Sequence, residues 1–194
     1  MSLQHEIAAT AARLIVDEGM EYGPAKRKAA QAFGVRPHQL PDNDLVEDAV
    51  REHLAVFHAD TQPAELAALR GVAREWMQRL AEFRPHLAGA VWRGTATRLS
   101  AVHLQLFCDD PKSAEIALLN QGIDFEVAQA TGGRGEPVDV LVFAARCDPL
   151  GERATVRLTI LDHDDLRGAL KPDARGRTAC GDLRALERLL EAGP

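Results

Sequence analysis

The chain has 194 residues, 46% of them hydrophobic, and a formal net charge of −6 at pH 7. This length allows one domain of ordinary size or two small ones, and the hydrophobic share is enough for a core. The part up to Pro85 (10 basic, 13 acidic) and the remainder (13 and 16) each carry −3, a balance that argues against a dedicated nucleic-acid binder with a basic face.

The three cysteines, Cys108, Cys147 and Cys180, are odd in number and form no Cys-x-x-Cys pair. A zinc ribbon or a disulfide framework is therefore not expected, and the thiols fit a reducing compartment. The first residues, MSLQHEIAATAARLIVDEG, lack the basic start of a signal peptide, and no apolar run approaches the roughly 20 residues that span a bilayer. We expect a cytoplasmic protein without a membrane segment, and the sequence leaves open whether it forms a homo-oligomer.

Hydrophobic periodicity predicts that residues 1–85 form a helical region. Apolar residues three and four apart indicate a first helix over residues 3–18, which ends at Gly19. Arg84-Pro85 breaks the helical pattern, because a residue before proline avoids helical backbone angles. The further helices expected between these points are residues 24–33, a helix that begins at a cap on Asn43 or Asp44 and runs to about His58, and residues 61–83.

Two features of the helical region invite a functional interpretation. Lys26, Arg27 and Lys28 follow one another on the second helix, as on a nucleic-acid-facing helix, but the acidic surroundings favour an ordinary solvated basic face. His53 and His58 are five residues apart, whereas a helical metal-binding pair is four apart. We therefore interpret these histidines as residues of the surface or of the core edge.

From Leu87 onward the pattern changes to strands, one of which ends near Phe107. Asp110-Pro111 then predicts the start of a helix that Gly122 ends. Strands over residues 123–128, 138–144 and 154–161 follow, and the short link between the last two predicts an antiparallel hairpin. With a final helix over residues 183–190, residues 86–194 are expected to form a mixed sheet of about four or five strands with helices on one side. The predicted fold class is α+β.

The stretch LAGAVWRGTATRLSAVHLQLFCDD, residues 87–110, is the most informative part of the chain. A short apolar strand, a segment rich in Gly, Thr and Ser, and an alternating strand follow one another in it. Polar groups held at a strand end beside a glycine loop commonly form a phosphate site. The alternation puts Val102, Leu104 and Leu106 on one face of the second strand, and His103, Gln105 and Phe107 on the other.

This stretch resembles the signature of the DNA-polymerase-β-like nucleotidyltransferase superfamily, which includes the bacterial minimal nucleotidyltransferases. That signature is an apolar strand, Gly-Ser, a variable turn often containing Ala-Arg-Gly, and Ser-Asp-hydrophobic-Asp-Leu. Gly89-Ala90, Trp92-Arg93-Gly94 and Ser100-Ala101-Val102-His103-Leu104 stand at the corresponding positions. The predicted order of elements over roughly residues 87–144 is also that of the family, and it implies a nucleotidyltransferase-like sheet.

The resemblance implies a degenerate active site. In the family, two Asp residues on the second strand and a third on its neighbour hold Mg²⁺ against nucleotide phosphates. Ala101 and His103 stand at the first two positions, and Asp139 is the candidate for the third. Mg²⁺ requires oxygen ligands, so one carboxylate cannot form this site, and a Mg²⁺ cofactor is expected only if other carboxylates rebuild it. Ala90 also replaces the serine whose hydroxyl approaches the phosphate.

These substitutions predict a non-catalytic, nucleotidyltransferase-like protein that binds a nucleotide or phosphate ligand. Arginine forms bidentate contacts with phosphate, although ordinary surface charges explain the arginines of this stretch equally well. The ligand-binding candidates are Gly89, Ala90, Arg93, Gly94, Thr95, Arg98 and Ser100.

Two alternatives stay open. In the first, the chain is an active enzyme with a rebuilt catalytic site, in which His103 and Asp139 pair across neighbouring strands and the histidine acts as a general base. In the second, the helical N-terminal region is a protein-interaction module, and Trp76 and Met77 are then exposed rather than buried.

Two polar segments are interpreted as structural. Asp162-His163-Asp164-Asp165 follows a strand and suggests a metal site, but Asp164 or Asp165 as a helix cap is the more common arrangement. The glycine-rich segment TGGRGE, residues 131–136, lacks the Gly-Lys-Ser/Thr of a P-loop and is expected to be a connection.

Overall fold

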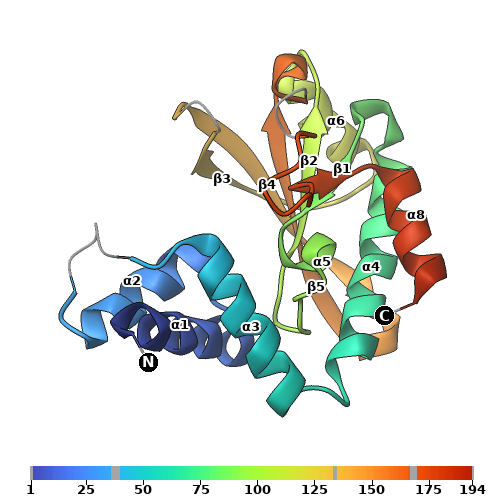
Figure 1. The fold of residues 1–194 in the computed structure, drawn as a ribbon. Helices are drawn as coiled ribbons and strands as arrows, with labels where there is room; N and C mark the ends of the chain where they lie inside the picture. Colours follow the sequence, from blue (N-terminus) through green and yellow to red (C-terminus); the bar gives the residue numbers. More distant parts are fainter. Residues whose placement is uncertain (1, 36–39, 133–134, 167–169, 194) are drawn as a thin grey trace. The chain divides into compact units, whose positions relative to one another are not determined.

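The computed structural model describes residues 2–35, 40–132, 135–166 and 170–193. Its class is α+β, as predicted: the described residues form several helices and one six-stranded mixed sheet (Figure 1). The chain divides into two compact units. We call Met1–Glu65 with Thr95–Ser100 the helical unit, and Leu66–Gly94 with Ala101–Pro194 the sheet unit. The division therefore falls inside a helix and not at Pro85, because the apolar side of that helix packs against the sheet.

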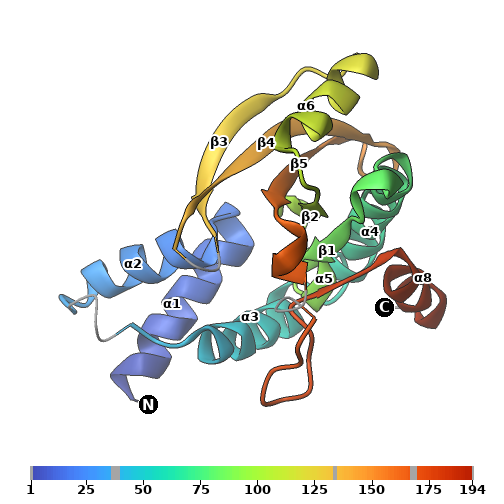
Figure 2. The same cartoon turned by 90° about the horizontal axis from the view of Figure 1, so that it is seen from above.

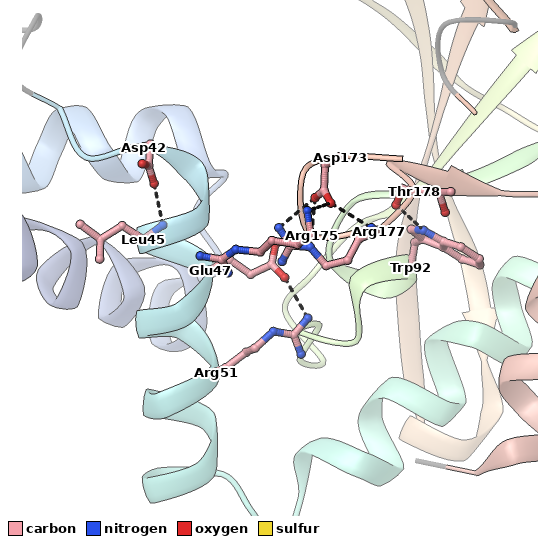
Figure 3. A network of polar contacts seen from close by, with 9 residues as sticks. All are labelled: Asp42, Leu45, Glu47, Arg51, Trp92, Asp173, Arg175, Arg177 and Thr178. Atoms are coloured by element: carbon pink, nitrogen blue, oxygen red, sulfur yellow. Dashed lines mark hydrogen bonds and ion pairs between the residues drawn. The ribbon is translucent and has the colours of Figure 1, made fainter. Parts of the chain in front are cut away.

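The helical unit contains the predicted helices with small shifts of their ends. Gly19 ends the first helix with a left-handed φ of 67°, and its N–H donates to the carbonyl of Leu14. Asp42 caps the third helix by accepting a 2.7 Å hydrogen bond from the N–H of Leu45 (Figure 3), one residue before the predicted start. The helices are α1 (Leu3–Glu18), α2 (Tyr22–Ala32), α3 (Asn43–Phe57) and the first turn of α4 (Gln62–Arg79).

The basic run on α2 makes contacts inside the helical unit. Lys26 Nζ donates to Asn43 Oδ1 at 2.7 Å, and Lys28 Nζ forms a 2.9 Å ion pair with Glu18. Both lysines thus contact polar or acidic groups of neighbouring helices, as expected for a solvated basic face.

The sheet unit has strand order β3-β4-β5-β2-β1-β6, in which only β2 and β5 run parallel among the described strands. The predicted hairpin is confirmed as β4 and β5. Two elements were not predicted: a short helix at the glycine turn and a two-residue strand in a polar segment. After α4, the elements are β1 (His86–Ala88), α5 (Gly89–Arg93), β2 (Val102–Phe107), α6 (Pro111–Asn120), β3 (Glu126–Thr131), β4 (Pro137–Cys147), β5 (Glu152–Leu161), β6 (Cys180–Gly181) and α8 (Leu183–Ala192), with 3-10 turns Ala81–Phe83, Asp148–Leu150 and His163–Asp165.

One face of the sheet, the core face, is covered by helix. Leu104 of β2, Leu158 of β5 and Leu141 of β4 pair in one row and are fully buried. Trp76 of α4 packs edge-on against Phe143 on this face, with ring centroids 4.4 Å apart. Helix α8 lies beside α4 (Figure 1, Figure 2).

The neighbouring row of the same strands points to the opposite face. His103, Arg157 and Val142 pair in register and are each half-buried. Gln105 and Thr159 form the next pair along β2 and β5, and both are also half-buried. Because paired residues of adjacent strands share a face, these side chains form one surface. We call the surface made by His103, Gln105, Arg157 and Thr159 the His103 face.

None of the helices in the described parts of the chain combines the length and the apolar character needed to cross a bilayer.

Trp92 of α5 attaches β6 to the rest of the sheet unit. Its indole Nε1 donates to the carbonyl of Thr178 at 2.9 Å (Figure 3). Its ring fills the space that a Cβ at Gly181 of β6 would need. Glycine is therefore required at position 181 by close packing.

Gly181→Ala should lower the free energy of unfolding by about 1–3 kcal/mol, because the Trp92 ring must move to admit the methyl group. Gly71→Ala is the matched control, since Gly71 lies within α4 and has no atom within 4 Å of an added Cβ. That control should raise the free energy of unfolding by about 0.5–1 kcal/mol, because alanine is the better helix former. Urea denaturation measures both, and equal effects would contradict the packing role of Trp92.

Candidate functional site

The centre of the predicted site is the unit β1–α5–β2. The two strands are antiparallel and Ala88 pairs with His103. Gly89, the first residue of α5, has a left-handed φ of 69°, and a Cβ added there would lie 3.3 Å from Cδ2 of His103. A side chain at position 89 would therefore crowd the imidazole, and glycine lets the backbone pass directly against it.

The other neighbour of β2 is β5, which runs parallel to it. His103 pairs with Arg157, and this register places the two residues side by side on the His103 face. Among the residues that the structure describes, no carboxylate forms an ion pair with Arg157. Sequence reasoning did not single out Arg157, because the pairing of β2 with a strand 50 residues later is a property of the sheet.

The structure does not bring His103 and Asp139 together. Asp139 lies on β4, and β5 separates that strand from β2. Val140 pairs with Thr159 and so shares the His103 face, and the adjacent Asp139 therefore points to the core face. The predicted contact across neighbouring strands fails because the long β4–β5 hairpin puts β5, and not β4, next to β2.

The predicted ligand-binding residues are divided between the two units. Gly89, Ala90, Arg93 and Gly94 belong to the sheet unit, whereas Thr95, Arg98 and Ser100 belong to the helical unit.

The segment with Thr95, Arg98 and Ser100 is held by contacts within the helical unit. The N–H of Arg98 donates to Glu65 Oε2 at 2.9 Å, and Ser100 Oγ accepts from the N–H of Thr97 at 3.0 Å. The side chain of Thr95 is buried, with 2% exposed. These contacts give Arg98 and Ser100 structural roles that the sequence did not indicate, whereas the buried hydroxyl of Thr95 has no hydrogen-bond partner among the described residues.

A buried arginine supports the glycine turn. Arg70 of α4 is 8% exposed, and its Nε donates to the carbonyl of Val91 in α5 at 3.2 Å. Burial lowers the pKa of this guanidinium from its ordinary value. Since arginine titrates far above neutral pH, the group stays charged. Arg70 thus supplies a hydrogen-bond donor to the Val91 carbonyl, one of the carbonyls near the end of α5 that have no partner within the helix.

The His103 face contains an unsatisfied polar group. Gln105 Oε1 is buried and has no hydrogen-bond partner among the described residues. Buried amide groups are normally hydrogen-bonded, so an unpaired one beside Arg157 and His103 suggests a position for a polar ligand atom or water.

The two polar segments near the C-terminal half have structural roles. After β5, the turn His163–Asp165 begins at Asp162, whose carbonyl accepts from the N–H of Asp165 at 3.1 Å. Asp162 precedes this turn with an extended backbone and makes no side-chain cap hydrogen bond, and residues 167–169, which follow the predicted caps Asp164 and Asp165, lie outside the described residues. His163 lies 3.6 Å from a carboxylate oxygen of Asp109. In the glycine-rich connection, residues 133–134 lie outside the described residues.

The cysteines are free thiols. Burial raises the pKa of Cys180 to about 11. Burial also raises the pKa of Cys108, with the charges of nearby aspartates adding to the effect, and burial raises that of Cys147. All three thiols are therefore protonated at neutral pH, which disfavours a thiolate nucleophile.

A second cluster of chemically active side chains lies in the helical unit. Nε2 of His53 and Nε2 of His58 lie 3.2 and 3.1 Å from the same carboxylate oxygen of Asp17. Among the described residues, Asp17, His53 and His58 form a group of three whose ligand atoms lie close enough together to hold a metal ion. Partial burial raises the pKa of Asp17, but the two hydrogen bonds and the histidine charges outweigh it and leave the pKa below its ordinary value.

Comparison of the chain with protein-family models, curated proteins and solved structures found no match.

Gly89→Ala should destabilise the fold by more than Gly122→Ala does. Both glycines have φ of 69°, but an added Cβ at Gly122 has no atom within 4 Å, whereas at Gly89 it meets His103. The left-handed backbone should cost about 1–2 kcal/mol at each position, and crowding of the imidazole adds to this only at Gly89. Chemical denaturation gives both values. If the two changes lower the free energy of unfolding equally, the added methyl group at position 89 does not crowd the imidazole of His103.

Proposed function

We propose that the sheet unit is a nucleotidyltransferase-like domain that does not transfer nucleotides and instead binds a phosphate-bearing ligand, a nucleotide or free phosphate, on its His103 face. The observation that carries the proposal is the register of Arg157 beside His103. In the family that the sequence resembles, the strand next to the second strand supplies the third metal-binding carboxylate. Here that neighbouring strand is β5, and its residue Arg157 pairs with His103 of β2.

The topology around β2 supports this comparison. Two antiparallel strands are joined through a segment that begins with Gly89, and helix α6 follows the second strand. The other strand that pairs with β2 is β5, which runs parallel to it. This arrangement fits the order of elements that the signature implies.

The residues at the metal positions favour binding without Mg²⁺. Ala101, His103 and Arg157 offer no oxygen ligand, which Mg²⁺ requires. The Arg157 guanidinium instead provides a fixed positive charge, and its planar donors suit two oxygens of one phosphate. An arginine can thus neutralise phosphate charge on a surface where the family uses a metal ion.

Two neighbouring groups on the same face are suited to the same ligand. The unpaired Oε1 of Gln105 can accept a hydrogen bond from a sugar hydroxyl, and the Thr159 hydroxyl lies in the paired position on β5. His103 adds a second nitrogen donor. Arg157, Thr159 and His103 can therefore donate hydrogen bonds to a phosphate, and none of the four side chains of the His103 face is a carboxylate.

The two alternatives have weaker support. A rebuilt catalytic site with His103 and Asp139 is disfavoured, because these residues point to opposite faces of the sheet. An interaction module was expected to expose Trp76 and Met77, but these side chains are only 3% and 0% exposed.

Isothermal titration of the full chain with nucleoside triphosphates and with inorganic phosphate, with and without Mg²⁺, tests the proposal. We expect binding that does not require Mg²⁺. Arg157→Gln should weaken that binding at least about tenfold, because one hydrogen bond to a charged group contributes about 1.5–3 kcal/mol.

Arg146→Gln is the matched control. Arg146 is exposed near the end of β4, four residues beyond Val142, the residue that pairs with Arg157, and it forms a 3.1 Å ion pair with Asp148. Its substitution should leave the affinity unchanged. Absence of binding to every nucleotide and to phosphate would leave the proposal without support, as would equal losses in the two arginine variants.

A further inference from the structure

Asp17, His53 and His58 come from three places in the sequence of the helical unit. Asp17 lies in the last turn of α1, His53 in the last third of α3, and His58 directly after α3. Helices α1 and α3 pack together, so their ends are held by a shared core. Its fully buried members include Ile7, Ala11, Ala12, Val46 and Val50.

The end of α3 explains how two histidines five residues apart reach one carboxylate. On a continuous helix, residues five apart point in different directions, since a turn has 3.6 residues. His58 is instead the residue that ends the helix, with φ −130° and ψ 16°. This non-helical backbone turns its side chain back toward His53, and both Nε2 atoms meet Asp17.

The three ligand atoms already have spacings that suit a bound ion. The two Nε2–Oδ1 distances are 3.2 and 3.1 Å, and all three ligand atoms lie within 4.8 Å of one another. A tetrahedral ion with bonds of about 2.0–2.1 Å separates its ligand atoms by about 3.3 Å. An ion can therefore take the place of the shared hydrogen bonds with small side-chain movements.

The backbone around His58 is fixed without an ion. Its N–H donates to the carbonyl of Leu54 at 2.9 Å, and its own carbonyl accepts from the N–H groups of Thr61 and Gln62. The ring of Phe57 lies 4.7 Å from that of His53, centroid to centroid. This preorganisation lowers the cost of bringing the ligands together.

The cluster is also open to ions from solvent. The side chains of His53, His58 and Asp17 are 17%, 30% and 39% exposed. Two imidazoles and one carboxylate favour Zn²⁺, Ni²⁺, Cu²⁺ or Fe²⁺, whereas Mg²⁺ and Ca²⁺ prefer oxygen ligands alone.

From this arrangement we infer that Asp17, His53 and His58 form a binding site for one divalent transition-metal ion, with Zn²⁺ as the reference ion. Three protein ligands leave at least one coordination position for water, which is the ligand count of catalytic rather than structural zinc sites. The inference rests on the helical unit and is independent of the phosphate site proposed for the sheet unit.

The test uses the full chain, treated with a chelator and exchanged into metal-free buffer. Titration with Zn²⁺ by calorimetry should give one ion per chain, and Co²⁺ should give visible absorption bands that report bonds to the protein. His53→Gln, His58→Gln and Asp17→Asn should each weaken Zn²⁺ binding at least about tenfold, since loss of even an outer partner of a ligand costs about 10- to 100-fold. Mg²⁺ should not compete.

His5→Gln is the matched control, because His5 is an exposed histidine of the same unit that contacts only Ser2 among the described residues and lies outside the cluster. It should bind Zn²⁺ as tightly as the unchanged chain. Circular dichroism confirms that each variant is folded before titration. The inference is overturned if the unchanged chain binds no Zn²⁺, if the three cluster variants bind it as tightly as the His5 variant, or if Mg²⁺ displaces it.

Discussion

The pairing of β2 on both of its edges is the constraint on which the sheet unit depends. β2 is antiparallel to β1 and parallel to β5, and its side chains alternate between two faces. Leu104 and its paired neighbours are buried under α4, while His103 and Arg157 share the opposite face. Because side chains in a strand have a period of two, a one-residue slip would exchange these faces and bury the polar row. Core packing therefore also fixes which residues can meet a ligand.

The same constraint bears on the phosphate site that we propose, which lacks metal ligands. A metal site requires several carboxylates at one point, whereas a single arginine already provides a positive charge and paired donors. In the proposed site the positive charge of Arg157 attracts phosphate, whereas a carboxylate without a bound metal ion would repel it.

The helical unit shows a different way to assemble a site. Its cluster depends on the end of a helix, because His58 leaves helical geometry and turns back toward His53. Asp17 then accepts from both imidazoles. The two units thus present separate chemistry. The helical unit has nitrogen and carboxylate ligands suited to a metal ion, and the sheet unit has a cationic side chain and a hydroxyl suited to an anion.

The sequence by itself determined the helical N-terminal region, β2, the β4–β5 hairpin and the α+β class, because apolar periodicity and Gly or Pro boundaries act over short stretches. One continuous motif also singled out Gly89 and His103 as candidate site residues, and the structure places them next to each other. Only the tertiary structure decided that Arg157, and not Asp139, lies beside His103, and that Asp17 joins His53 to His58. Strand order and helix packing bring together residues that are 36 or more positions apart, and no local spacing records such contacts.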